Sequence, residues 1–187
     1  MTEPTPQAVV ALPSPAAALE RRFGDILRLQ MHDVPMVNPA LQVQAVGFRP
    51  WHHHWLGVLV TPWFMNLLLF PRIPAHWHGI GERESRHYVF PAGVFEFIGS
   101  RDATLGDYQA CSLFSPMFDF ANQSGAVDTA AAALEALFEP VNRQASEVPP
   151  PPAPAPAETP AVPATPTSAV SKRDFLFGGK RRPTREP

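Results

Sequence analysis

The chain has 187 residues, with 24 prolines, one cysteine and a formal net charge of −2 at pH 7. A single cysteine excludes an intrachain disulfide framework and any metal site built from several thiolates, and it fits a reducing compartment. The charge is divided unevenly: residues 171–187 hold six basic and two acidic residues, a net +4, which leaves −6 on residues 1–170. An acidic body does not indicate a nucleic-acid-binding domain, so no nucleic-acid partner is expected.

The prolines divide the chain into four segments. A Pro-rich N-terminus at 1–13 is predicted to be disordered, and 14–140 is long enough for one ordinary domain. Nine prolines between Pro149 and Pro166 alternate with Ala and Thr, which predicts a solvated, disordered Pro/Ala-rich linker over 141–170. The segment 171–187 is a basic tail.

Targeting and membrane segments are not predicted. The N-terminus lacks a basic n-region and a sustained apolar stretch, so it does not resemble a signal peptide. The apolar run at 55–70 contains Pro62 and is shorter than the roughly 20 residues that a membrane-spanning helix needs. We therefore expect a cytoplasmic protein without a membrane span.

The first element along the chain is a helix predicted over 15–31. Ser14 is a good N-cap and Pro15 fits the first helical turn. Leu19, Phe23 and Ile26 follow at helical spacing, and Pro35 lies beyond the expected end of the helix. This apolar stripe requires a covering surface, which the following strands would supply.

From Leu41 apolar and polar residues alternate, which predicts a half-buried strand over 41–46. A turn at 49–54 leads into the second arm of a hairpin at 55–61, and a further strand is predicted over 64–70. Pro62 cannot donate a hydrogen bond to a ladder and should mark a strand end, an edge or a bulge. The strand over 64–70 is apolar on both faces, which indicates a central position with a helix on at least one side.

Three further strands and a second helix complete the prediction. A loop over 71–85 precedes strands at 86–90 and 94–98, and a last strand follows at 105–113. Ser115–Pro116 repeats the Ser-Pro helix start and predicts a helix extending to Phe138. The expected fold is α+β: a single domain with an antiparallel sheet of five or six strands, packed by an N-terminal and a C-terminal helix.

The segment 57–71 is the most apolar part of the chain, and it contains no residue suited to acid–base or nucleophilic chemistry. Cys111 lies in an apolar context, Glu96 should face away from the core, and no phosphate-binding or nucleophile-elbow motif is present. We therefore expect a binding protein, not an enzyme, and no cofactor.

Aromatic residues and methionine beside two Ser/Thr-Pro steps form either a core or a partner-binding groove. Trp63 is expected to be half-exposed at a rim. The candidate partner-binding residues are Pro62, Trp63, Phe64, Met65, Asn66, Tyr108, Cys111, Met117 and Phe118.

Histidines at 52–54, 76 and 78 raise the alternative of a protein that handles nickel or iron. Consecutive residues of an extended segment point to opposite faces, so the run at 52–54 cannot converge on one ion. His76 and His78 share a face and are the weak candidates for a metal site. The main interpretation is loop histidines, with the loops pinned by Trp51, Trp55 and Trp77.

Four motifs follow one another in order over about residues 16–140. They are Ala45–Arg49 with Trp51 and Trp55; Leu56–Leu67; Phe90–Gly93 with Phe95–Ile98; and Tyr108–Phe118. Together they resemble the nickel–iron hydrogenase assembly chaperone family known as HybE or HupJ, in particular the HupJ branch that serves uptake hydrogenases. The resemblance implies a small, cytoplasmic, non-enzymatic chaperone. It also implies binding of a hydrogenase subunit precursor before twin-arginine export, and contact with other hydrogenase maturation proteins.

The basic tail contains a second resemblance. Ser171, Lys172, Arg173, Phe175 and Leu176 are similar to the twin-arginine motif S-R-R-x-F-L, with Lys172 in place of the first arginine. No apolar region follows, so the segment should not act as an export signal. Our hypothesis is that it imitates the signal peptide of the hydrogenase small subunit and occupies the binding site of the chaperone itself or of a partner. A chance resemblance remains the alternative.

Overall fold

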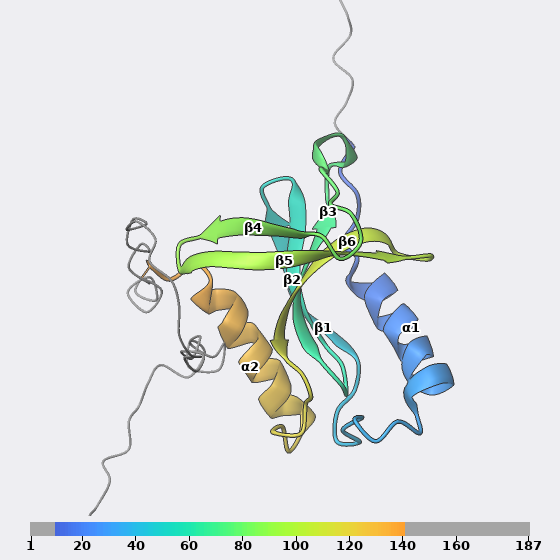
Figure 1. The fold of residues 1–187 in the computed structure, drawn as a ribbon. Helices are drawn as coiled ribbons and strands as arrows, with labels where there is room; N and C mark the ends of the chain where they lie inside the picture. The colour runs from blue at the N-terminus through green and yellow to red at the C-terminus, as the bar shows by residue number, and fades with distance from the viewer. Residues whose placement is uncertain (1–9, 141–187) are drawn as a thin grey trace, which may run out of the picture.

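The computed structural model describes residues 10–140 (Figure 1). The linker and the basic tail lie outside these residues, as does most of the N-terminal segment. The described chain starts inside that segment, where Leu12 makes two hydrogen bonds. Its N–H donates to the Arg72 carbonyl at 2.7 Å, and its carbonyl accepts from the indole of Trp55 at 3.0 Å.

Six strands form one antiparallel sheet in the order β1-β2-β3-β6-β5-β4. The strands are β1 (Gln44–Trp51), β2 (His54–Val60), β3 (Met65–Pro71), β4 (Ser85–Phe90), β5 (Gly93–Asp102) and β6 (Gly106–Phe114). A short 3-10 helix, η2 (Pro74–His76), lies between β3 and β4. The α+β prediction is confirmed. The turn expected at 49–54 is shorter, because β1 continues to Trp51 and only two residues separate it from β2.

Helix α1 (Ala16–Ile26) covers one face of the sheet and continues as a π-helical turn, η1 (Leu27–Met31), so the helix predicted over 15–31 is confirmed. Leu19 and Phe23 are buried in a cluster with Leu59 and Leu68 of the central strands. An ion pair fastens the helix to the end of β5, since the Arg22 guanidinium lies 2.9 Å from the Asp102 carboxylate. Figure 1 shows α1 and α2 on opposite sides of the strands.

Helix α2 (Gln123–Ala136) packs on the other face through alanines at 126, 130 and 133 and through Leu134. Small side chains let the helix approach the sheet closely. The contact is tight at Gly47, where an added Cβ would lie 2.6 Å from Leu134 Cδ2. The strand predicted over 64–70 is therefore central and covered on both faces.

The predicted start of the second helix at Ser115–Pro116 is wrong. The helix begins at Gln123, where the Asn122 side chain accepts a hydrogen bond from the Gly125 N–H at 2.9 Å. Residues 115–122 form a loop with a turn, in which the Phe120 N–H donates to the Met117 carbonyl at 3.2 Å. The loop is fixed by a distant side chain, since the Asn38 amide donates to the carbonyls of Met117 and Phe120.

Strand β5 changes its pairing partner along its length. It pairs with β6 from Asp102↔Gly106 to Ile98↔Ala110, and its earlier residues pair with β4. β3 pairs with the other edge of β6 from Gln109 to Phe114, so beyond Ala110 it is the strand that β6 pairs with. In Figure 1 the β4–β5 hairpin consequently lies across the other strands, and the second half of β6 runs on below it toward the loop at 115–122.

Candidate functional site

The turn between β2 and β3 is fixed by Thr61. Its N–H and its hydroxyl both donate to the Phe64 carbonyl, at 2.8 and 2.9 Å, and the hydroxyl accepts from the Phe64 N–H at 2.9 Å. Pro62 thus follows the end of β2, as predicted. Trp63 is only 9% exposed, so the expectation of a half-exposed rim position is wrong. Its indole joins the cluster under α1, where Leu19 and Phe23 cover it.

The loop after β6 is held against this turn by Asn38, which is 7% exposed. The Asn38 amide donates to the carbonyls of Met117 at 3.0 Å and Phe120 at 2.8 Å, and the backbone N–H of Asn38 donates to the Pro62 carbonyl at 2.8 Å. Sequence reasoning missed this residue. Its signal is the Asn38–Pro39 step, since Asn before Pro favours a turn in which the side chain binds nearby backbone.

The structure brings the two predicted stretches, 62–66 and 115–118, side by side. Besides Asn38, the Ser115 hydroxyl lies 3.4 Å from the Trp63 carbonyl. Exposure separates the nine candidates. Pro62, Trp63, Met65, Cys111 and Met117 are buried, Phe64, Asn66 and Tyr108 are half-buried, and Phe118 is 59% exposed. Buried members can support a binding surface, whereas only the others can touch a partner in this conformation. Their proposed role in binding stays a prediction.

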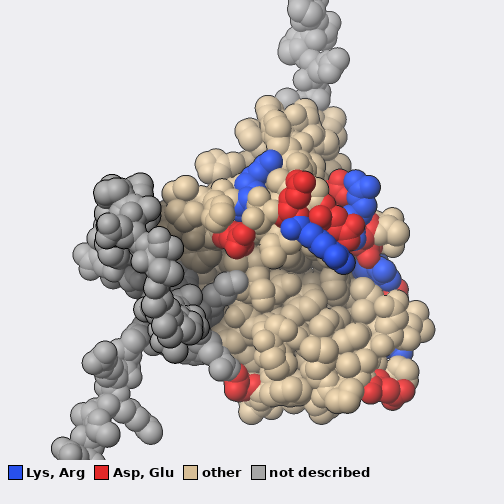
Figure 2. Space-filling model, in the orientation of Figure 1, with Lys and Arg blue, Asp and Glu red and all other residues tan. Residues whose placement is uncertain are grey.

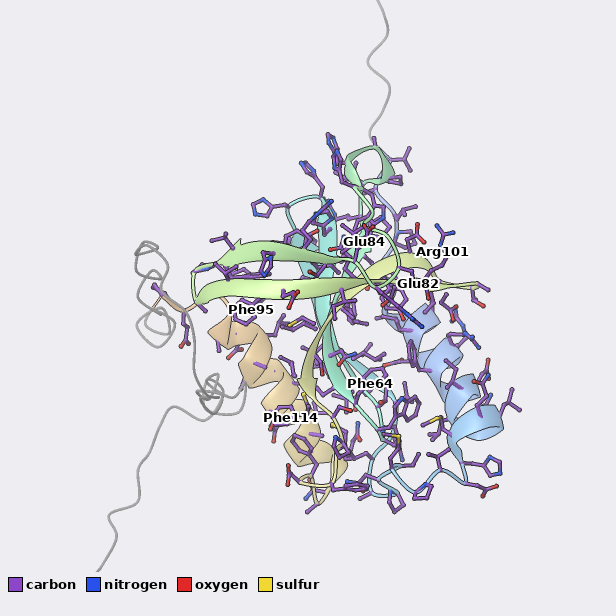
Figure 3. All side chains as sticks on the ribbon, viewed as in Figure 1. Phe64, Glu82, Glu84, Phe95, Arg101 and Phe114 are labelled. Carbon is purple, nitrogen blue, oxygen red and sulfur yellow. The ribbon has the colours of Figure 1, made fainter. Side chains whose placement is uncertain are left out.

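A surface around the second half of β6 combines aromatic rings with an absence of charge. Figure 2 shows a broad area without Lys, Arg, Asp or Glu among the described residues visible below the charged groups that lie over β5. In Figure 3, Phe95 is labelled just below β5 and above α2, and Phe64 and Phe114 are labelled lower down, between the ribbons of α2 and α1. We define the β6 face by its aromatic side chains and the serine beside them: Phe64, Phe95, Ser112, Phe114 and Phe118.

The β6 face is where both cores approach solvent. Phe95 and Phe114 belong to the cluster under α2, and the Phe114 ring lies 5.1 Å from that of Phe120. Phe64 belongs to the cluster under α1, with its ring 5.7 Å from that of Phe23. Phe118 and Ser112 are exposed, whereas Phe114 is 5% exposed and forms part of the floor.

The chain around this surface is acidic. From Asp102 to Pro140 the sequence contains six carboxylates and no Lys or Arg. Two of the six are paired with arginines from other segments, Asp102 with Arg22 and Asp107 with Arg101. The Arg49 guanidinium donates to the Leu134 carbonyl of α2 at 3.1 Å. Asp119 in the loop, and Asp128 and Glu135 on α2, are exposed. The arrangement offers an apolar surface bordered by negative charge, which favours an extended, basic and apolar ligand.

The histidines form stacked pairs. The rings of His53 and His76 stack at 4.2 Å, and the His54 ring lies 5.4 Å from that of Trp77. Burial, with smaller contributions from neighbouring cationic groups, lowers the pKa of His54 from 6.5 to about 4. His78 Nδ1 lies 3.1 Å from the carbonyl oxygen of His76. Within residues 10–140, no group of three or more His, Cys, Asp and Glu side chains is arranged to hold a metal ion.

A sequence model described as "NiFe-hydrogenase assembly, chaperone, HybE" matches residues 14–178. The chain belongs to the HybE family of nickel–iron hydrogenase assembly chaperones. The family resemblance found in the sequence is confirmed. The match passes the end of the described domain and includes residues 171–178 of the tail.

Curated relatives carry related names. The protein HoxT of Cupriavidus necator is 38% identical over 182 residues, which covers 87% of this chain and 88% of the relative. The hydrogenase expression/formation protein HupJ of Bradyrhizobium diazoefficiens is 38% identical over 156 residues and 83% of each chain. The solution structure of HybE from Escherichia coli shares the fold, with a TM-score of 0.54 at 19% identity, over 88% of this chain and 98% of that one.

One relative bears a name that implies a metal. "Probable rubredoxin HupJ" of Rhodobacter capsulatus is 45% identical over 127 residues, covering 68% of this chain but only 46% of the relative. An iron bound by thiolates needs several cysteines, and this HybE-family chain has one. The residues present do not fit such a site, and the family match does not favour the metal-handling alternative. No helix of the described HybE-family domain has the length and hydropathy to cross a membrane.

Proposed function

We propose that this chaperone acts in the maturation of an uptake nickel–iron hydrogenase by binding the precursor of a structural subunit in the cytoplasm, before export. The proposed client is the small subunit with its twin-arginine signal peptide. The proposed role is binding without catalysis. The β6 face carries the proposal, because it places exposed and half-buried aromatic rings next to a loop and a helix that carry the exposed carboxylates of Asp119, Asp128 and Glu135.

A twin-arginine signal peptide has the complementary chemistry. Its motif places two arginines before Phe and Leu, and an apolar region follows. The apolar part would contact Phe64 and Phe118, while the arginines would approach Asp119 and Asp128 at the border. Aromatic anchors of this kind contribute most of the binding free energy at protein interfaces.

Buried candidates support this surface from below. Asn38 holds the loop that carries Phe118, and Thr61 holds the turn that carries Phe64. Met117 is 0% exposed between them, so it fixes the loop without touching the client. The two anchors thus come from loops about fifty residues apart in the sequence, joined by hydrogen bonds to backbone carbonyls.

The test is the substitution Phe118→Ala in the full chain. We expect about tenfold weaker binding of the small-subunit signal peptide, because an exposed aromatic anchor is lost at no cost to the core. Isothermal titration calorimetry measures the affinity, and circular dichroism checks the fold.

Val94→Ala is the matched control, since Val94 is 61% exposed on β5 and lies outside the β6 face. It should bind like the parent chain. Unchanged affinity in Phe118→Ala and in a Phe64→Ala/Phe118→Ala double variant would refute the proposed binding surface.

A further inference from the structure

We propose that the tail segment Ser171–Gly178 docks on the β6 face of its own chain and holds the site until a precursor displaces it. The identity of the displacing ligand rests on the proposed function. The docking itself does not, because it concerns two parts of one chain. In this arrangement the tail occupies the site at which the client would bind.

The extent of the family match supports a role for the segment. The match does not stop after α2, near Ala136, but runs to residue 178. It therefore crosses the Pro/Ala-rich linker and ends after Phe175, Leu176 and Phe177. A match that ends there is expected if the segment contributes to a property of the family, whereas a solubilising tail requires only charge.

The segment and the face are chemically complementary. Phe175–Phe177 is a run of three large apolar residues, with Lys172 and Arg173 before it and three more basic residues at 180–182. The β6 face contains the exposed Phe118 and the half-buried Phe64 and Phe95, and Figure 2 shows a broad area without charged side chains below the charged groups over β5. The tail segment thus has an apolar centre with basic residues on both sides. It matches the β6 face, which is apolar and has an acidic border.

The net charges of the domain and of the tail also favour docking. Residues 10–140 contain twelve carboxylates and eight arginines, a net −4, and residues 171–187 carry +4. The opposite charges oppose separation of tail and domain at low salt. They favour contact with the loop at 115–122 and α2, which carry the exposed carboxylates of Asp119, Asp128 and Glu135 and border the β6 face.

The linker is long enough for this contact. The described chain ends at Pro140, and about 30 residues separate it from Ser171. A segment of that length spans about 30 Å as a random coil and up to about 90 Å as polyproline II. A domain of this size is about 35 Å across, so the tail can reach the β6 face without strain. Tethering raises its local concentration to about millimolar, so even a weak contact is occupied much of the time.

Occupancy of the β6 face by the tail would lower the apparent affinity of the domain for other ligands. A ligand that must displace the tail binds with an affinity reduced by the fraction of free sites. Short basic apolar peptides would therefore be rejected, whereas a precursor with further contacts would displace the tail. The segment resembles the twin-arginine motif closely enough to compete for the same contacts.

Photo-crosslinking in the full chain tests the docking. p-Benzoylphenylalanine replaces Phe175, and after irradiation mass spectrometry identifies the crosslinked peptide. We expect crosslinks to peptides that contain Phe64, Phe95 or Ser112–Phe118, at a yield independent of protein concentration. The same photo-residue at Thr165 of the linker is the control and should give at most a few per cent of that yield.

Three outcomes would overturn the inference: no crosslink from position 175, crosslinks to other surfaces, or a yield that rises with concentration and joins tagged to untagged copies. The last would show that the tail of a second copy is the occupant. The triple variant Phe175→Ala/Leu176→Ala/Phe177→Ala gives an independent check. It should bind a synthetic twin-arginine peptide several-fold more tightly than the parent, whereas the linker variant Val162→Ala should not.

Adding the twin-arginine peptide to the crosslinking reaction separates this inference from the proposed function. If excess peptide abolishes the crosslink from position 175, the result supports both the docking and the proposed client. A crosslink to the β6 face that excess peptide leaves unchanged would keep the docking and contradict the proposed client. Peptide binding at the β6 face without any position-175 crosslink would keep the client and overturn the docking.

Discussion

His54 shows how one side chain can couple stability to pH. It lies at the start of β2, with its ring 6.2 Å from those of Trp51 and Tyr88 and 5.4 Å from that of Trp77. Nδ1 is buried without a hydrogen-bond partner among the described residues. Arg86 and the neighbouring His52, His53 and His78 add to the cost of a positive charge here, so the pKa falls to about 4.

The folded pKa lies below the ordinary value of 6.5, so the unfolded chain takes up a proton first as the pH falls. The free energy of unfolding should therefore decrease between pH 6.5 and 4, with a contribution from His54 of about 1 kcal/mol after allowance for its partial exposure. His54→Phe keeps the ring and removes the proton site, so it should flatten this part of the pH dependence.

Urea midpoints at pH 7.5 and 4.5 measure the effect of His54→Phe. The control is His87→Gln, because His87 is an exposed histidine on β4 that should leave the slope unchanged. Equal pH dependence in His54→Phe and the parent chain would contradict the assignment.

At the scale of elements, the loops at 34–41 and 115–122 behave as one unit through Asn38. Removing its side chain leaves the Met117 and Phe120 carbonyls without that donor and also removes the acceptor for the Ala40 N–H. We expect Asn38→Ala to lower the free energy of unfolding by about 2–3 kcal/mol, because it removes three hydrogen bonds at a largely buried position. Chemical denaturation measures the loss.

Asn122→Ala is the matched control. Asn122 accepts one N-cap hydrogen bond at an exposed position, so its loss should cost only about 1 kcal/mol. The Asn38 variant should also weaken signal-peptide binding, since it loosens the loop that carries Phe118, whereas the Asn122 variant should not. Similar losses of stability in the two variants would contradict the central role of Asn38.

The hydrogen bonds of Asn38 explain why the Ser-Pro signal predicted the start of α1 correctly and the start of α2 wrongly. Ser14–Pro15 precedes a helix at Ala16 and Ser115–Pro116 does not precede one, although the dipeptides are identical. The difference is tertiary, because the backbone groups after Pro116 bind Asn38, which lies 79 residues before Met117 in the chain. No local pattern around residues 115–122 contains that information.

At the scale of the whole molecule, the charge distribution predicts a salt dependence. If carboxylates around the β6 face attract the arginines of a signal peptide, raising NaCl from about 50 to 500 mM should weaken binding several-fold, because exposed charges are screened. The loss caused by Phe118→Ala should persist at both salt concentrations, since burial of apolar surface is not screened. Calorimetry at the two concentrations measures both effects.

Salt-independent affinity would contradict the electrostatic part of the proposal while leaving the aromatic part in place. Asp128→Asn provides a further comparison, because it removes one exposed carboxylate of α2 without changing its size. Its effect should appear at low salt and vanish at high salt.

The sequence by itself determined the local elements and the family. The apolar runs of β2 and β3, the helical stripe of α1 and the strand end at Pro62 are local properties, and each was predicted. The four motifs that resembled the hydrogenase chaperones depend only on the order of residues, so they needed no structure.

Only the tertiary structure decided which aromatic residues remain accessible. Trp63 and Phe118 have similar sequence surroundings, yet one is 9% and the other 59% exposed. Burial depends on what packs against a residue: α1 covers Trp63, and the Asn38 hydrogen bonds hold Phe118 on an exposed loop. The β6 face likewise exists because β5 leaves β6 after Ile98↔Ala110, a change of pairing between distant segments that a single strand pattern cannot encode.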